Sequence, residues 1–246
     1  KYALKAGNAG VITATNVYFI TANVGCVGEC EIGSTFTACM FAIAFNATGS
    51  SKDGFRSISS NPCTLKACLF LGWTGMAVNA IESTLINCSA YEAMTAVTPT
   101  YGFWAGDIYN CAVWAPNVTS YGARAYGSGN TIDYVSAYAP SASASVYAAN
   151  GASAGANNIL TAAITTNGNN LYVNPPTNME PHASGLAFQN GNPAYALPAK
   201  DFQDNDWNDP PSRGAYEQVP AAGGGGGTGK SSLNNLVNLN NLNNLC

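Results

Sequence analysis

The sequence predicts an all-β solenoid, a parallel β-helix with a C-terminal cap and an extended tail. Octets of one pattern recur 20 to 29 residues apart, and a fixed period of this size indicates a repeat architecture. The octets are rich in Thr, Ile, Val, Tyr and Cys, which favour strands. Gly, Asn and Ser interrupt every helical apolar stripe. The octets begin at Thr35, Thr64, Thr84, Asp107 and Thr131.

Apolar residues hold positions two, five and seven of the octets, so these positions are expected to point inward. Positions three and four are expected to turn a corner between two strands. Asn87 and Asn110 hold position four, where Asn tolerates unusual backbone angles. Position two is held by Phe36, Leu65, Leu85, Ile108 and Ile132.

Position five predicts an internal ladder of cysteines. Stacked parallel strands lie about 4.8 Å apart, so like residues sit above one another. In-register side chains point alike, which is poor geometry for a disulfide, so free buried thiols are expected. The ladder consists of Cys39, Cys68, Cys88 and Cys111, with Val135 in the last octet.

A second echo precedes two of the octets. Gly75 to Ala80 (GMAVNA) stands nine residues before Thr84, and Gly122 to Gly127 (GARAYG) stands nine residues before Thr131. This second similarity supports the repeat.

The C-terminal part contains three phrases, Gly191-Asn-Pro-Ala-Tyr195, an acidic turn with Asp204, Asp206 and Asp209, and Gly214-Ala-Tyr-Glu217. Together they resemble the closing segment of right-handed parallel β-helix repeat proteins found on bacterial surfaces and in phages. Ser212-Arg213 departs from the Asp-Ile that usually precedes the last phrase. The resemblance implies the fold, and this fold carries both enzymes and passive surface proteins.

Five segments are expected. Residues 1–34 start the solenoid, 35–156 form its coils, 157–219 cap it, 220–230 form a Gly-rich linker and 231–246 form a Leu/Asn repeat tail. A cap is needed because the last coil of a solenoid exposes unpaired strand edges.

The tail repeats leucine every third residue, which does not suit the 3.6-residue period of an α-helix. Low-complexity disorder and an anchoring or oligomerisation peptide are both open, and three chains sharing one axis would suit the period. The assembly candidates are Leu233, Leu236, Leu239, Leu242, Leu245 and Cys246.

The composition excludes several functions. Only 9% of the residues are charged and the net charge is −4, so no nucleic-acid partner is expected. The apolar runs are far shorter than the roughly 20 residues of a membrane helix, so no membrane span is expected. The single histidine, His182, lies in a Pro-bounded loop, and neither a cofactor nor a metal site is expected. Calcium at the acidic turn is less favoured than a structural role.

Candidate chemistry is sparse. Asp107 and Asp133 lie one coil apart and form the best carboxylate pair for glycoside hydrolysis, although a role as solvated turn residues is favoured. Exposed aromatic rings could stack on sugars or anchor a protein partner, or simply cover the core. The binding candidates are Trp104, Trp114, Tyr121 and Tyr126.

The favoured function is a non-enzymatic structural protein on a virion or extracellular surface, of the phage fibre, tailspike or head-decoration type, anchored by its tail. Other virion or surface-assembly proteins are the expected partners, and glycans are candidate ligands. The chain is expected to form a homo-oligomer, with a trimer favoured. The alternatives are a carbohydrate-active β-helix enzyme (polysaccharide hydrolase or lyase) and a bacterial surface adhesin or filament subunit.

Overall fold

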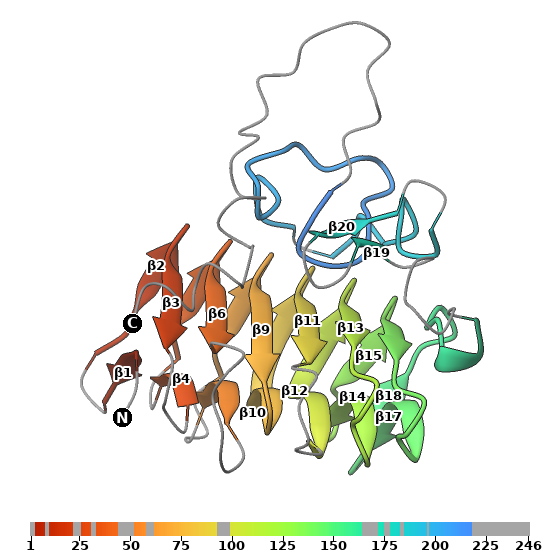
Figure 1. The fold of residues 1–246 in the computed structure, drawn as a ribbon, viewed down its shortest axis with the longest axis horizontal. Coiled ribbons are helices and arrows are strands. Elements are labelled where there is room, and N and C mark those ends of the chain that lie inside the picture. Colours follow the sequence, from red (N-terminus) through yellow and green to blue (C-terminus); the bar gives the residue numbers. More distant parts are fainter. Residues whose placement is uncertain are drawn as a thin grey trace, which may run out of the picture.

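The parallel β-helix class is confirmed by the computed structural model, in which strands stack coil upon coil. Figure 1 shows the strands following one another along the long axis in sequence order. The part of the chain that the structure describes contains no α-helix and a single 3-10 turn, Thr161–Ala163. The structure describes residues 3–7, 10–21, 26–30, 33–43, 52–57, 62–92, 99–163, 172–174, 178–182, 185–195 and 197–217.

Each coil has three faces. The first face consists of β1 (Leu4–Ala6), β4 (Cys26–Cys30), β7 (Asp53–Ser57), β10 (Met76–Ile86), β12 (Tyr101–Tyr109), β14 (Tyr121–Tyr126) and β17 (Ala144–Ala149). The second face consists of β2 (Thr13–Thr15), β5 (Thr35–Thr37), β8 (Thr64–Lys66), the ends of β10 and β12, β15 (Thr131–Asp133) and β18 (Ser153–Ala154). The third face consists of β3 (Tyr18–Thr21), β6 (Met40–Ile43), β9 (Leu69–Trp73), β11 (Ser89–Glu92), β13 (Ala112–Trp114) and β16 (Ser136–Tyr138).

The strand register confirms the octet alignment. Thr64 pairs with Thr35 and with Thr84, and Thr84 pairs with Asp107. All five residues of position two are fully buried. Position four makes the corner between the second and third faces, because each residue there adopts a left-handed backbone conformation, which is uncommon for residues other than glycine. Asn16 holds the equivalent place in the coil before the first octet. The residues with this conformation are Asn16, Ala38, Ala67, Asn87, Asn110 and Tyr134, with φ between 48° and 57°.

The two similar segments upstream of the octets both contribute to strands of the first face, but they are not in matching register. Val78 pairs with Phe103, which pairs with Ala123, so Gly75 does not lie above Gly122. The cause is a register shift in β10 between Ala80 and Thr84, where β10 is longer than β12. A bulge of this kind cannot be seen in residue type alone.

The interior of the solenoid is filled with stacked side chains rather than hollow. Phe19, Phe41 and Phe70 form a stack through three coils, with ring centroids 5.1 and 5.4 Å apart. Phe41 and Phe70 hold position seven of their octets, so the pattern that predicted inward residues also predicted this stack. A packed interior leaves only the outer faces for binding.

The C-terminal segment differs from the expectation in where it lies. In Figure 1 the blue residues lie along one side of the solenoid, over the ends of the third-face strands, rather than on its last coil. The antiparallel pair β19 (Tyr172–Asn174) and β20 (Asn178–Pro181) lies on the same side. The outer surface of the third face explains this position. It is apolar along several coils, and Ala187, Phe202, Ala215 and Tyr216 pack against it.

The Gly214-Ala-Tyr-Glu217 phrase docks this segment through backbone contacts. The Gly214 N–H donates to the Asn110 carbonyl oxygen at 2.6 Å, and the Ala215 N–H donates to Ser89 Oγ at 2.8 Å. Gly214 has a φ of 106°, and a Cβ there would lie 2.5 Å from Ser89 Oγ. A residue without a side chain is therefore required at this position.

The linker and tail lie outside the described residues. An assembly role therefore remains a prediction for Leu233, Leu236, Leu239, Leu242, Leu245 and Cys246.

Candidate functional site

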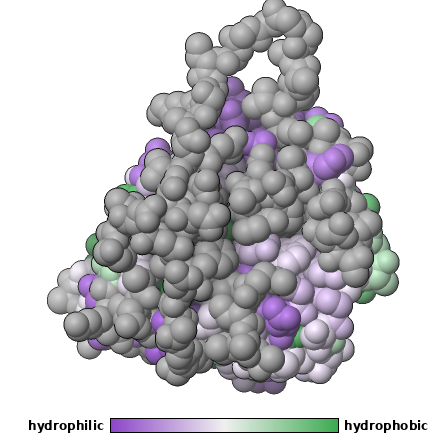
Figure 2. Space-filling view, viewed as in Figure 1, coloured by the Kyte–Doolittle hydropathy of each residue, from purple (hydrophilic) through white to green (hydrophobic). Residues whose placement is uncertain are grey.

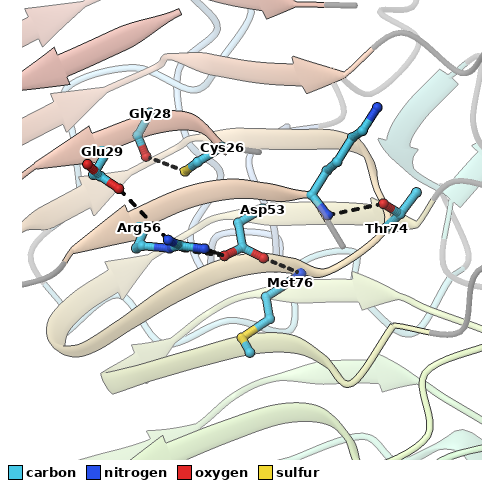
Figure 3. Close-up of polar contacts among 8 residues, drawn as sticks. Cys26, Gly28, Glu29, Asp53, Arg56, Thr74 and Met76 are labelled. Carbon is cyan, nitrogen blue, oxygen red and sulfur yellow. Dashed lines mark hydrogen bonds and ion pairs between the residues drawn. The ribbon is translucent and has the colours of Figure 1, made fainter. Parts of the chain in front are cut away.

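The outer surface of the first face carries most of the candidate chemistry, and its two halves differ. Toward the N-terminal coils, charged residues on three strands form a cluster, of which Figure 3 shows Glu29, Asp53 and Arg56. Lys5 pairs in register with Glu29, and Glu29 pairs with Arg56. The Lys5 Nζ lies 3.0 Å from Glu29 Oε1, and Arg56 Nη1 lies 3.9 Å from Glu29 Oε2. Opposite charges on adjacent strands thus hold three coils together.

Asp53 completes this charged cluster. Its Oδ2 accepts hydrogen bonds from Arg56 Nη2 at 2.7 Å and Nε at 3.2 Å, a two-pronged contact with one oxygen. Its Oδ1 accepts the Met76 N–H of the next coil at 2.9 Å. Glu29 and Asp53 are each only 3% exposed. Both carboxylates are therefore committed to structure, and neither is free to take a substrate proton.

Cys26 lies beside the same cluster and does not act as a nucleophile in this setting. Its thiol donates to the Gly28 carbonyl oxygen at 3.0 Å. Burial, and then the negative charge of Asp53, raises the pKa of Cys26 to about 12. Because the thiolate is the reactive form, Cys26 stays unreactive near neutral pH.

Toward the C-terminal coils, the first face carries an aromatic cluster. Three of the four aromatic candidates, Trp104, Tyr121 and Tyr126, meet here, since β12 and β14 are neighbours. Their common neighbour is Arg124, whose guanidinium carbon lies within 6 Å of every ring centroid in the cluster. These rings belong to Tyr101, Trp104, Tyr121, Tyr126 and Tyr147.

Sequence reasoning missed Tyr101, Tyr147 and the central place of Arg124. Arg124 pairs in register with Trp104 on one side and Tyr147 on the other. The signal was the register of the strands upstream of the octets, which differs from that of the octets: Trp104 pairs with Arg124, 20 residues on, whereas Ile108 pairs with Ile132, 24 residues on.

Trp114 lies elsewhere. It is on the third face, 6% exposed, and stacks between Tyr91 and Tyr138 with centroids 4.6 and 5.9 Å away. These three rings hold octet position eight, and the C-terminal segment packs on the same surface. A ring covered in this way supports the docking of the chain's own segment and is not available to a ligand. The continuous apolar runs around position eight indicated that this surface is covered, because strands buried on both faces have nearly continuous apolar sequences.

Asp107 and Asp133 are occupied by contacts within the solenoid. Asp107 Oδ1 accepts the Thr131 N–H at 2.7 Å and the Tyr109 hydroxyl at 3.0 Å. Asp133 Oδ1 accepts the Tyr134 and Asn157 N–H groups at 3.0 and 3.2 Å. Both aspartates therefore join one coil to the next.

The four ladder cysteines lie inside the solenoid on successive coils, fully buried and free of disulfides. Burial raises the pKa of Cys68 and Cys88 well above the ordinary value. Their thiols donate to carbonyl oxygens at 3.3 to 3.5 Å, as Cys88 Sγ does to Leu65. The same burial makes them packing groups.

Outside the ladder, Cys30 and Cys63 are also buried and form no disulfide, and a hydrogen bond with Cys30 lowers the pKa of Cys63 to about 7.

The acidic residues of the C-terminal segment serve its own folding. Buried Asp201 accepts N–H groups of Gln203, Asn205 and Glu217 at 2.7 to 2.8 Å. Buried Glu217 accepts the Ser212 hydroxyl and N–H. The three aspartates named from the sequence are peripheral to this network, and Asp206 pairs with Lys200.

The described residues contain neither a metal site nor a membrane-spanning helix. No group of three or more His, Cys, Asp or Glu side chains among them could hold a metal ion. No helix among them is long and apolar enough to cross a bilayer. His182, in its loop after β20, belongs to no such group.

Comparison with models of known protein families, with curated proteins and with solved structures finds no match for this chain.

Proposed function

We propose that this chain is a non-enzymatic structural protein of a virion surface, of the fibre, tailspike or head-decoration type. Its β-solenoid is the projecting body, and the C-terminal tail anchors it to other virion proteins or joins it into a homo-oligomer, with a trimer favoured. One observation carries the proposal. Three aspartates of the solenoid, Asp53, Asp107 and Asp133, which include the best carboxylate pair for hydrolysis, all accept hydrogen bonds from neighbouring coils.

The core supports the same function. Aromatic stacking and buried thiols run through the coils, and the third face is covered by the chain's own C-terminal segment. Such a body is stabilised by strand pairing along its whole length, which suits a rigid spacer. An enzyme of the hydrolase type needs an acid and a base that are free to move protons.

Truncation tests the anchoring role. Removing residues 221–246 should leave a folded monomer, because the body has its own core and the tail's leucines have none. Light scattering should show the loss of the oligomer, and the truncated chain should not join the particle. A truncated chain that keeps the full-length oligomeric state and still joins the particle would rule out the tail as anchor.

Turnover assays test the non-enzymatic role. Incubation with acidic and neutral polysaccharides should release neither reducing ends nor unsaturated products. Turnover that Asp107→Asn or Asp133→Asn abolishes would favour the enzyme alternative. A full-length chain found on bacterial cells and absent from particles would favour the adhesin or filament alternative.

A further inference from the structure

The aromatic cluster surrounds one positive charge. The guanidinium carbon of Arg124 lies 4.9 Å from the ring centroid of Trp104 and 5.2 Å from that of Tyr126. Tyr121, Tyr101 and Tyr147 follow at 5.5, 5.6 and 5.9 Å. The rings come from three adjacent strands, β12, β14 and β17, so the charge sits within a rigid aromatic surface.

The hydrogen-bonding capacity of Arg124 is mostly unused. Its Nη1 donates to the Tyr101 hydroxyl at 3.2 Å, and its Nε is buried without a partner. Among the described residues, no carboxylate lies within ion-pair distance of it. A guanidinium carries five N–H donors in a planar fork that matches a carboxylate. The missing counter-charge therefore points to an anionic ligand.

The tyrosines around Arg124 form a stack of rings along the solenoid. Tyr101 stacks on Tyr121 with centroids 5.8 Å apart, and Tyr121 stacks on Tyr147 at 4.4 Å with 6° between the ring planes. Three strands at about 4.8 Å spacing give the stack a length of about 10 Å. Tyr147 is 39% exposed, so the stack reaches solvent. Figure 2 shows mostly pale residues, which have near-neutral hydropathy, on the side of the molecule where Figure 1 places β14 and β17.

We infer that the Arg124 cluster binds an oligosaccharide whose sugars carry carboxylates. The negative face of an aromatic ring packs against the C–H face of a pyranose ring. The Arg124 fork would take the carboxylate of one sugar while the exposed Tyr147 ring packs against a neighbouring sugar. This site would work in a free or an assembled chain, so its failure would leave the proposed assembly role untouched.

The same observations argue against other polyanions and against a protein partner. A nucleic acid carries a phosphate on every nucleotide and needs several cations along its path, whereas the Arg124 cluster offers one cation, Arg124 itself. A stable protein interface buries about 800 Å² on each partner, with about 20 residues or more. Six side chains on three strands fit a short glycan better.

Calorimetric titration of the full-length chain tests the inference. Tetragalacturonic acid is the acidic probe and maltotetraose is the neutral one. The acidic probe should bind at least tenfold more tightly, and Arg124→Gln should remove that preference, because about 1.4 kcal/mol of charge-assisted contact corresponds to a factor of ten. Tyr147→Ala, a change at an exposed rim ring, should weaken binding of the acidic probe without unfolding the chain.

Arg56→Gln is the matched control, because Arg56 lies in the same outward row but is neutralised. Provided that its circular dichroism spectrum shows a folded chain, it should keep the full preference for the acidic probe. The inference fails if Arg124→Gln binds both probes as the unmodified chain does. It also fails if neither probe binds at millimolar concentration, or if oligothymidine binds more tightly than tetragalacturonic acid.

Discussion

Arg56 and Arg124 occupy the same outward row of one sheet and meet opposite surroundings. The row runs through register pairs from Arg56 to Asn79, then to Trp104, then to Arg124. Arg56 contacts two buried carboxylates, whereas Arg124 contacts five aromatic rings. The backbone position is equivalent in both cases. The difference shows that the neighbouring side chains, on the same strand and on adjacent coils, decide whether a charge stabilises the body or remains available to a ligand.

Energetically the two arginines have different roles. The charge of Arg56 compensates Glu29 and Asp53, which would otherwise be buried anions. The charge of Arg124 compensates nothing within the described chain, and its attraction to the rings is modest. Stability should therefore depend on Arg56, and binding on Arg124.

The largest effect is expected from Arg56→Met, which breaks the charged half of the comparison. It leaves two buried carboxylates without their shared cation, so the free energy of unfolding should fall by about 3 kcal/mol, the lower end for buried pairs because Arg56 is partly exposed. Urea denaturation measures the change. A loss below about 1 kcal/mol would mean that Lys5 and backbone N–H groups suffice.

Glu92 sharpens the comparison as a buried carboxyl with no described cation. It is fully buried, Oε2 accepts the Asn117 N–H at 2.9 Å, and Oε1 has no partner. Burial raises its pKa from 4.5 to about 7. The folded state then holds a proton that the unfolded state releases, so stability is full below pH 4.5 and is lost as pH rises through 7.

Glu92→Gln should remove this pH dependence. At pH 8 the variant should be more stable than the unmodified chain by about 2 kcal/mol, since the shift is worth about 3 kcal/mol and the new amide N–H₂ offsets part of it. Thermal unfolding between pH 4.5 and 8 measures both slopes. A variant that keeps the slope would place its origin in another group.

Arg124→Met should cost little stability if the aromatic half of the comparison is correct. The expected loss in the free energy of unfolding is about 1 kcal/mol, from cation–π contacts on a partly exposed surface. Methionine keeps packing between the rings, so the fold should persist. A loss equal to that of Arg56→Met, measured in the same urea titration, would contradict the division of roles.

The smallest effect is expected from Lys5→Gln at the exposed end of the charged cluster. The Lys5 side chain is 47% exposed, so the ion pair with Glu29 should contribute about 0.5 kcal/mol or less. Raising the salt concentration should reduce even this difference. A loss above about 1 kcal/mol would extend the buried cluster to Lys5.

Residue patterns predicted the second and third faces better than the first. The octets contain both strands and the corner between them, with no insertion inside, so position two of each octet could be aligned by reading. The first-face strands precede the octets by variable distances, and the β10 shift misaligns Val78 with its partners. The sequence therefore named Trp104 and Tyr121 without placing Tyr147 beside them. It also grouped Trp114 with them, although the third face holds it under the C-terminal segment.

The sequence by itself determined the coil: the inward residues, the left-handed corner at position four and the stacked cysteines. These follow from local periodicity, because a two-residue side-chain alternation and a repeated corner leave one way to bury the apolar positions. Only the tertiary structure decided the outer surfaces. Outward residues are not constrained by the core, so the pairing of Arg56 with Glu29, the rings around Arg124 and the cover over Trp114 depend on which coils and segments come to lie side by side.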